Sequence, residues 1–274
     1  MIAVLSVSSV FAQSPEEKGL ELARKSDQAG NGFVGEKSEM ELVLVNAHGD
    51  KVTRKLLSRV RETEKDGDKS IVTFEWPADV KGTRMLTWTH KTSDDDQWLY
   101  LPSIKRVKRI ISSNKSGSFM GSEFAYEDLG SAEVEKYKFK FLKDDLLEGR
   151  KQWAIERVPV DERSGYSRQV MWMDHEFLQP ARIEYYDRKG ELLKTADFTF
   201  ESRLVVGVDR LEVTADGTGA VAAVVSVVVA FALHESFADL VAIPFDGAGD
   251  PFEAVVQNTK VVSVSMIDGA WAIR

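Results

Sequence analysis

Between positions 98 and 110 the chain reads Trp98-Leu99-Tyr100-Leu101-Pro102-Ser103-Ile104-Lys105-Arg106-Val107-Lys108-Arg109-Ile110. Apolar and polar residues alternate on both sides of the proline, which is typical of two strands joined at a bend. A second aromatic block follows a polar linker and reads Ser118-Phe119-Met120-Gly121-Ser122-Glu123-Phe124-Ala125-Tyr126-Glu127-Asp128-Leu129. Neither block groups residues that usually support catalysis, so this region favours binding over chemistry.

Strand patterns continue on both sides of this region. Turn residues such as Asn46 to Asp50 and Asp187 to Gly190 separate short runs that alternate with a period of two. The expected strands are Lys37 to Val45, Lys51 to Arg61, Ser70 to Trp76, Thr83 to His90, Gln97 to Leu101, Ile104 to Ile111, Val134 to Leu142, Gln152 to Val158, Ser167 to Met173, Ala181 to Asp187 and Leu192 to Phe200. Such a series without helical periods predicts a mainly β protein built on one strongly curved antiparallel sheet.

One helix is expected before the first strand. Ser14-Pro15-Glu16-Glu17 combines an N-cap serine, a proline at the first helical position and a glutamate at the third. The helix should run from about Pro15 to Ala29, and the glycines at 30 and 32 should end it.

The bulk composition excludes several classes of protein. The chain has 274 residues, of which 43% are hydrophobic, so it can bury a substantial core. Its formal net charge of -8 makes nucleic acid an unsuitable partner, because phosphate binding needs a concentrated cationic surface. The absence of cysteine excludes disulfides, thiolate metal sites, a cysteine nucleophile and a lipobox.

The two ends of the chain differ from the middle. Residues 1–12 are apolar and uncharged and end in Val10-Phe11-Ala12, which indicates a signal peptide without its basic region; a buried N-terminal strand is the alternative. After Glu201, lysine and arginine become rare, and the run from Gly219 to Leu233 consists almost wholly of small residues and valine. Residues 202–274 therefore have three interpretations: strands that complete the sheet, an aberrant tail that is not native sequence, or a membrane-active segment. The expected domain is residues 13–201.

Several blocks together resemble the outer-membrane lipoprotein-sorting family, and more narrowly its long uncharacterised branch. The blocks are Gly32-Phe33, Met40-Glu41-Leu42, Lys81-Gly82-Thr83, Trp98 to Pro102, Arg106 to Ile110 and Phe119 to Leu129. The likeness covers about residues 14–201. It implies an exported periplasmic protein whose sheet forms an unclosed barrel, with helices and loops across its mouth.

The resemblance also implies a function. In this fold an apolar cavity receives a lipid or the acyl chains of a lipoprotein, and no cofactor or covalent chemistry is required. It implies a monomeric carrier or chaperone, with an inner-membrane permease of the resistance-nodulation-division type as a possible partner. The alternative is an accessory module that docks on such an exporter and carries no ligand. The valine-rich tail departs from the family pattern, and the arginine that holds the lid in classical carriers has no assigned equivalent.

A cavity for acyl chains needs large apolar side chains on the concave face of the sheet, since each buried methylene contributes about 0.8 kcal/mol. The candidate ligand-binding residues are Trp76, Leu86, Trp88, Trp98, Tyr100, Phe119, Met120, Phe124 and Trp172. The alternative for each is simple core filling, because alternation reports burial and not what the side chain is buried against. The linker Ser112 to Ser118 is either a mobile lid at the cavity mouth or an ordinary surface loop.

The cations Lys105, Arg106, Lys108 and Arg109 are candidates for contact with an anionic headgroup or an acidic partner. The alternative is a solvated strand whose charges discourage edge pairing.

Metal and catalytic sites have little support. Asp94-Asp95-Asp96 has oxygen ligands but no surrounding metal loop, and the four histidines lack ligand spacing. Only Asp174-His175-Glu176 places a histidine between carboxylates, and no nucleophile or phosphate-loop motif is present. We therefore expect neither an enzyme nor a metal site.

Overall fold

The computed structural model of the protein describes residues 13–63, 65–201, 209–217, 222–232, 264–267 and 270–273. The expected signal peptide at residues 1–12 lies outside the described residues, as does much of the segment after residue 232.

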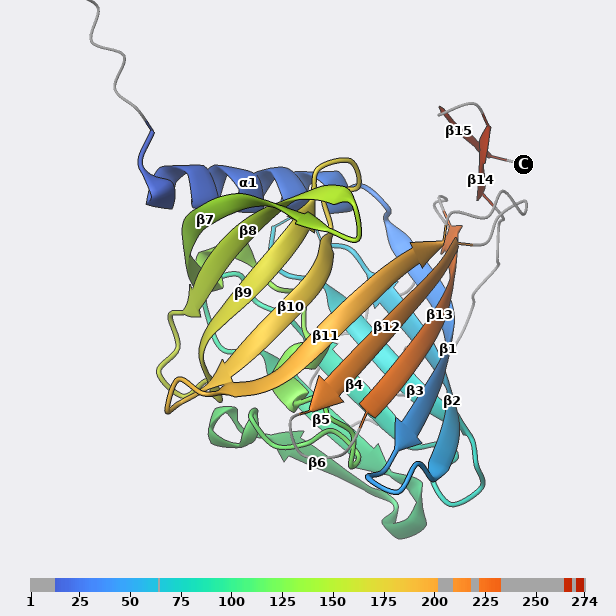
Figure 1. Ribbon diagram of the computed structural model, residues 1–274. Helices are drawn as coiled ribbons and strands as arrows, with labels where there is room; N and C mark the ends of the chain where they lie inside the picture. The colour runs from blue at the N-terminus through green and yellow to red at the C-terminus, as the bar shows by residue number, and fades with distance from the viewer. Residues whose placement is uncertain are drawn as a thin grey trace, which may run out of the picture.

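The N-terminal helix is present and is capped as its sequence predicts. Helix α1 spans Pro15–Gly30. The Ser14 hydroxyl accepts a hydrogen bond from the Glu17 amide at 3.2 Å, and the Ser14 amide donates to the Glu17 carboxylate at 2.9 Å. The helix lies across one end of the neighbouring strands and buries Gly19, Leu22 and Ala23 there (Figure 1).

Strands make up most of the rest. In the first half of the chain they are β1 Gly35–Val45, β2 Lys51–Arg61, β3 Lys69–Trp76, β4 Arg84–Trp88, β5 Asp96–Leu101 and β6 Arg106–Ile110. The second half holds β7 Tyr137–Leu147, β8 Arg150–Pro159, β9 Tyr166–Asp174, β10 Pro180–Asp187, β11 Leu192–Glu201, β12 Asp209–Gly217 and β13 Ala222–Ala232. A short hairpin of β14 Val264–Ile267 and β15 Ala270–Ile273 forms a separate sheet. The described residues also contain four short 3-10 turns: η1 Pro102–Ile104, η2 Ser112–Asn114, η3 Tyr126–Leu129 and η4 Val134–Lys136.

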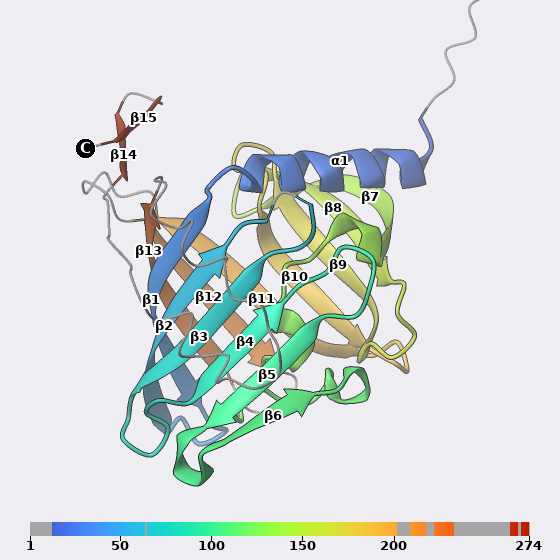
Figure 2. The ribbon, with the colours of Figure 1, turned by 180° about the vertical axis from the view of Figure 1, so that it is seen from behind.

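The thirteen strands pair in the order β6-β5-β4-β3-β2-β1-β13-β12-β11-β10-β9-β8-β7. Neighbouring strands in this sheet pair antiparallel throughout the described residues. The sheet curls so that its two halves face one another, while β6 and β7 remain unpaired edges (Figures 1 and 2). The predicted fold class, a curved antiparallel sheet forming an unclosed barrel with an N-terminal helix, is confirmed.

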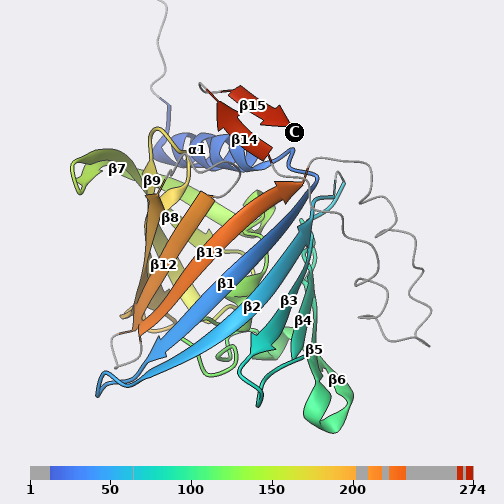
Figure 3. The same ribbon diagram turned by 90° about the vertical axis from the view of Figure 1, so that its right-hand side faces the viewer.

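Strands β12 and β13 connect the two halves (Figure 3). The backbone of β13 pairs with β1 from Gly35↔Ala232 to Val45↔Ala222, and β12 pairs with both β13 and β11. Which of the three interpretations of residues 202–274 holds stays a prediction. The division of the chain at residue 201 stays a prediction.

The core consists of two apolar clusters on the inner face of the curl and a smaller one on the outer face. The first inner cluster lies on β1 to β5 and contains Leu42, Leu56, Phe74, Val80, Met85, Leu99 and Phe119. The second lies under α1 on β7 to β11 and contains Leu22, Ala23, Phe139, Ile155, Tyr166, Met171, Met173, Ile183, Tyr185 and Ala196. The outer cluster is formed by Ile71 and Leu86, with Trp88, Trp98 and Tyr100 packed against them.

Candidate functional site

The inner face is covered by a segment of irregular chain, residues 112–129, which we call the covering segment. Phe124 packs against both inner clusters, so this segment joins the two halves of the sheet. Phe119 is only 3% exposed, and its ring centroid lies 5.8 Å from that of Phe74 and 5.9 Å from that of Tyr126. The covering segment therefore fills the trough, which is the concave inner side of the curled sheet, with aromatic side chains.

The covering segment folds back on itself. Ser118 and Ala125 form an isolated antiparallel bridge, and the amide of Phe119 donates to the carbonyl of Phe124 at 2.6 Å. Met120 and Gly121 turn the chain through the left-handed region, with φ of 51° and 74°. This tight loop points its apolar side chains at the sheet, which explains how a polar, glycine-broken sequence can be buried.

One buried ion pair holds the covering segment against the second half of the sheet. Lys194 Nζ lies 2.5 Å from Asp128 Oδ2 and donates to the carbonyl of Glu123 at 2.8 Å. The two charged side chains are 4% and 8% exposed. The Tyr166 hydroxyl donates to Asp128 Oδ1 at 2.9 Å, and burial, with the charge of Asp128, raises the pKa of that phenol far above its usual value. Removing either partner would leave the other charge buried without a counter-ion, which strongly destabilises a fold.

Further hydrogen bonds tie the covering segment to both halves. Arg54 of β2 donates to the carbonyl of Met120 at 2.5 Å, and Gln97 of β5 donates to the carbonyl of Tyr126 at 2.8 Å. On the other side, Glu127 accepts from the Ser164 hydroxyl at 2.7 Å and from the Gly165 amide at 2.8 Å. Burial raises the pKa of Glu127 despite these two bonds.

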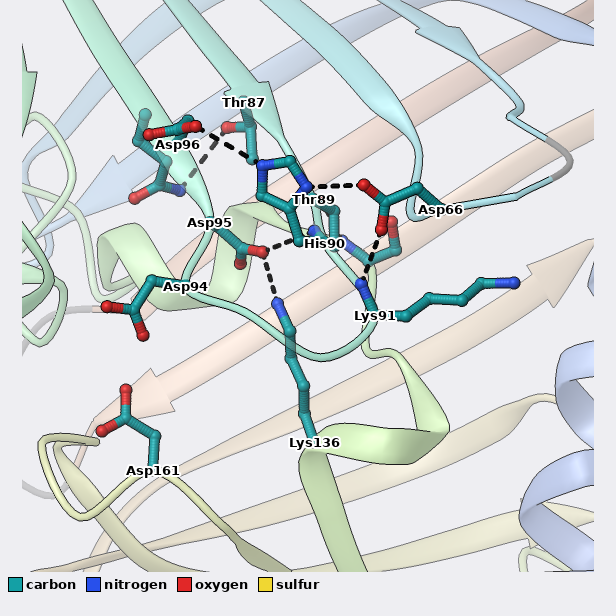
Figure 4. Close-up of polar contacts among 12 residues, drawn as sticks. Asp66, Thr87, Thr89, His90, Lys91, Asp94, Asp95, Asp96, Lys136 and Asp161 are labelled. Atoms are coloured by element: carbon teal, nitrogen blue, oxygen red, sulfur yellow. Dashed lines mark hydrogen bonds and ion pairs between the residues drawn. The ribbon is translucent and has the colours of Figure 1, made fainter.

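The gap between the edges β6 and β7 is a polar cleft of about 550 Å³. Its walls come from residues 91–95, 97, 110–112, 115, 127, 131, 135–137 and 159–164. Arg163 reaches across to Asp94 at 2.5 Å, and Lys115 to Asp161 at 2.5 Å. Lys136 pairs with Asp95 (Figure 4). Hydrogen bonds from Arg163 and Ser112 lower the pKa of Asp94. These ion pairs link the β4–β5 loop and the covering segment to the β8–β9 loop and η4.

His90 lies beside this cleft between two carboxylates (Figure 4). Its Nδ1 is 2.6 Å from Asp66 Oδ2, and its Nε2 is 3.4 Å from Asp96 Oδ2. Burial of the ring lowers the pKa of His90, but the two carboxylates outweigh burial and raise it overall. The hydrogen bond with His90 lowers the pKa of Asp66 to about 2. When it is protonated, the ring can donate to both aspartates and so joins the β2–β3 turn to β5.

The structure divides the candidate ligand-binding residues between the two faces. Phe119, Met120 and Phe124 lie on the inner face, in or against its clusters. Leu86, Trp88, Trp98 and Tyr100 lie on the outer face, opposite to where a concave-face cavity requires them. Trp172 is also outside, and its Nε1 donates to Asp145 at 3.0 Å, while Trp76 ends β3 with 51% of its surface exposed.

The reason for this division is that both faces of β4 and β5 are buried. Met85 and Leu99 face inward while their chain neighbours Leu86 and Trp98 face outward. Two adjacent apolar residues give no signal of which one points inward. The ligand-binding role of the nine residues stays a prediction. For the five on the outer face, any ligand would have to bind on that face.

The predicted cationic run lies on the edge strand and its hairpin. Lys105, Arg106, Lys108 and Arg109 are all exposed, and Arg109 pairs with Asp96. Their contact with a headgroup or partner stays a prediction. Each residue of Asp94-Asp95-Asp96 meets a cationic or histidine side chain, and the described residues contain no group of three His, Asp or Glu that could hold a metal ion.

Sequence reasoning missed Lys194, Asp128, Tyr166 and His90 as determinants of the site. A signal existed for Lys194, because it shares strand parity with Ala196 and Phe198 and therefore places a charge on an apolar face. Asp128 lies in a loop, where no periodicity indicates burial. None of the described helices is both long and apolar enough to cross a lipid bilayer.

Comparisons with known proteins agree with the architecture. A family model described as an uncharacterized protein matches residues 66–211. An outer membrane lipoprotein-sorting protein domain from Vibrio parahaemolyticus is 42% identical, with a TM-score of 0.72 over 81% of this chain and 96% of that one. A DUF1329 family protein from Desulfovibrio piger is 27% identical, with a TM-score of 0.74 over 82% of this chain and 97% of that one.

A LolA superfamily protein from Nitrosomonas europaea shares the fold at 17% identity, with a TM-score of 0.60 over 80% of this chain and 96% of that one. No curated protein sequence matches the chain.

Proposed function

The chain belongs to the outer-membrane lipoprotein-sorting family, and from that premise we propose that it is a periplasmic carrier for a lipid or an acylated lipoprotein. The acyl chains lie against the inner face of the sheet, and the protein passes them between membrane partners. The 42% identical relative is described as an outer membrane lipoprotein-sorting protein domain, which supports a role in handling lipids or lipoproteins.

One observation carries this proposal. The first inner cluster and the junction between the two clusters are covered by a loop with aromatic side chains, whereas α1 packs only on the second cluster. A loop that leaves the trough exposes apolar surface on both halves of the sheet. An acyl chain can then replace Phe119 and Phe124 at little net loss of buried apolar area, since one apolar surface substitutes for another.

Opening of the protein means that the covering segment leaves the inner face, and this requires the Lys194–Asp128 pair to separate. Displacing the covering segment separates two buried charges, so the closed state is favoured when no ligand or partner compensates. A ligand that binds only the open state shifts this equilibrium by its differential affinity. The pair thus acts as a latch, and directional transfer follows from differences in affinity between donor, carrier and acceptor.

Native mass spectrometry of gently purified protein tests the proposal. We expect lipid adducts on the wild type and more of them on Phe124→Asp, because this side chain packs against both clusters and its loss weakens the closed state that competes with the acyl chain. Leu146→Asp is the matched control, since that leucine is 67% exposed and the charge change is the same. Equal adducts in both variants, or none on the wild type after mild extraction, would contradict a carrier.

A ligand-free accessory module that docks on a resistance-nodulation-division exporter is the second candidate. The observation that favours it is that the inner clusters are already filled by the chain's own side chains. In that case the purified wild type carries no lipid and co-purifies with a permease from solubilised inner membrane. The two candidates therefore predict opposite results in the same purification.

A further inference from the structure

The outer face of β2 to β5 carries a concentration of positive charge. In antiparallel pairs, residues opposite one another point to the same face, and the register places Arg59 opposite Ile71, Lys69 opposite Trp88, and Arg84 opposite Tyr100. Extending these rows over β2 to β6 gives the outer cationic face: Lys55, Arg59, Arg61, Lys69, Arg84 and Arg109. Figure 2 views these strands from the side opposite to Figure 1.

Acidic residues are few on this face. Asp96 lies opposite Trp88 and pairs with Arg109, and Glu75 lies close enough to favour the charged form of Arg59. On the next strand, β1, charges of both signs return with Lys37, Glu39 and Glu41. The whole chain has a net charge of -8, so this excess of positive charge is a local property of the outer face of β2 to β6.

Arg59 keeps its charge at a cost to the fold. Burial lowers the pKa of Arg59; the negative charge of Glu75 partly offsets this effect, and the positive charge of Arg84 adds to it. The Nε atom of Arg59 is buried and has no hydrogen-bond partner among the described residues. A buried guanidinium with an unsatisfied donor lowers the stability of the isolated protein, and anionic groups at the surface would favour its charged form.

Aromatic rings lie among these cations. Trp88 and Trp98 meet edge to face with ring centroids 5.3 Å apart, and Lys69 Nζ lies 4.5 Å from the Trp88 ring. Tyr100 lies opposite Val107, which is 40% exposed, and Ile104 in the adjoining hairpin is 51% exposed. Tryptophan and tyrosine prefer the interface between lipid headgroups and acyl chains, where lysine and arginine bind anionic headgroups.

We propose that the outer cationic face, with Trp88, Trp98 and Tyr100 at its centre, docks the protein onto the surface of an anionic phospholipid bilayer. The cations meet headgroup phosphates, and the aromatic rings and exposed aliphatic side chains enter the headgroup layer. The surface is on the opposite side of the sheet from the covering segment, so docking does not depend on the proposed carrier role.

Vesicle flotation tests this proposal. The full chain should float with vesicles that contain phosphatidylglycerol and should stay unbound with pure phosphatidylcholine. Binding should weaken steeply as salt is raised, since a surface potential acts only within a Debye length. Lys55→Gln combined with Lys69→Gln should lower the partition coefficient roughly 30-fold, from about 1 kcal/mol for each cation near the surface.

The matched control is Lys138→Gln with Lys151→Gln, which removes two exposed charges from β7 and β8. This variant should bind as the wild type does. Insertion of the aromatic side chains is measured separately. Brominated lipid should quench the tryptophan emission of Trp88→Phe less than that of the wild type. Equal binding of both lysine variants, or no binding to anionic vesicles at low salt, would overturn the proposal; binding of a protein partner alone to this face would do the same.

Discussion

At the scale of single residues, Lys194 and Asp128 form the most deeply buried ion pair among the described residues. Both charges are removed from water, and their 2.5 Å contact is supported by the Tyr166 hydroxyl and the Glu123 carbonyl. The pair holds a loop of the first half of the chain against a strand of the second. Removing one member leaves the other charge buried without its counter-ion.

We therefore expect Lys194→Met to lower the free energy of unfolding by about 3–5 kcal/mol. Asp128→Leu in the same chain should recover most of that loss, because an apolar pair has no desolvation penalty. Urea unfolding of the two single variants and the double variant measures the coupling. Lys189→Met, in an exposed turn, should change stability little; a similar loss there would mean that the pair has no special weight.

His90 predicts a dependence of stability on pH. The folded protein raises the pKa of His90 above its ordinary 6.5, so its contribution is fully present below that value and is lost as pH rises through the folded pKa. The stability difference between wild type and His90→Asn should therefore be larger at pH 5.5 than at pH 8.5. Thermal unfolding at both pH values checks this, and a difference that grows with rising pH would contradict it.

At the scale of elements, the strands and the helix were predictable and their faces were not. Period-two alternation and turn residues predict the strands, and β2 begins and ends where expected. The inner and outer sides of β4 and β5 could not be predicted, because Met85 and Leu86 are both buried on opposite faces. Burial of the covering segment depends on Lys194, about 70 residues later in the chain.

The contact between α1 and β7 gives an element-scale prediction. A Cβ atom at Gly19 would lie 2.7 Å from the Phe141 amide nitrogen and 2.8 Å from Lys140 backbone atoms. Gly19→Ala should therefore destabilise the protein, although alanine normally stabilises a helix interior by about 1 kcal/mol. At Gly30 the nearest such contact is 3.9 Å, so Gly30→Ala should be tolerated. Chemical denaturation compares the two, and equal stability of both variants would contradict the close packing.

At the scale of the whole molecule, the sheet presents two faces with different chemistry. The inner face is apolar and covered by a latched loop, and the outer face of β2 to β6 is cationic and aromatic. Family resemblance predicted the open barrel and a lipid-handling role. It did not predict the latch, because Lys194 and Asp128 belong to separate segments that meet only in the folded chain.

The central claim is that an acyl chain displaces the covering segment from the inner face. Hydrogen exchange measured with and without a lysophospholipid below its micelle concentration tests this most directly, through the amides of Phe119, Ser122 and Tyr126, which donate to backbone carbonyls in the closed state. The account predicts faster exchange of these amides when lipid binds, with unchanged exchange in β8 and β9. Slower or unchanged exchange in the covering segment at saturating lipid would contradict it.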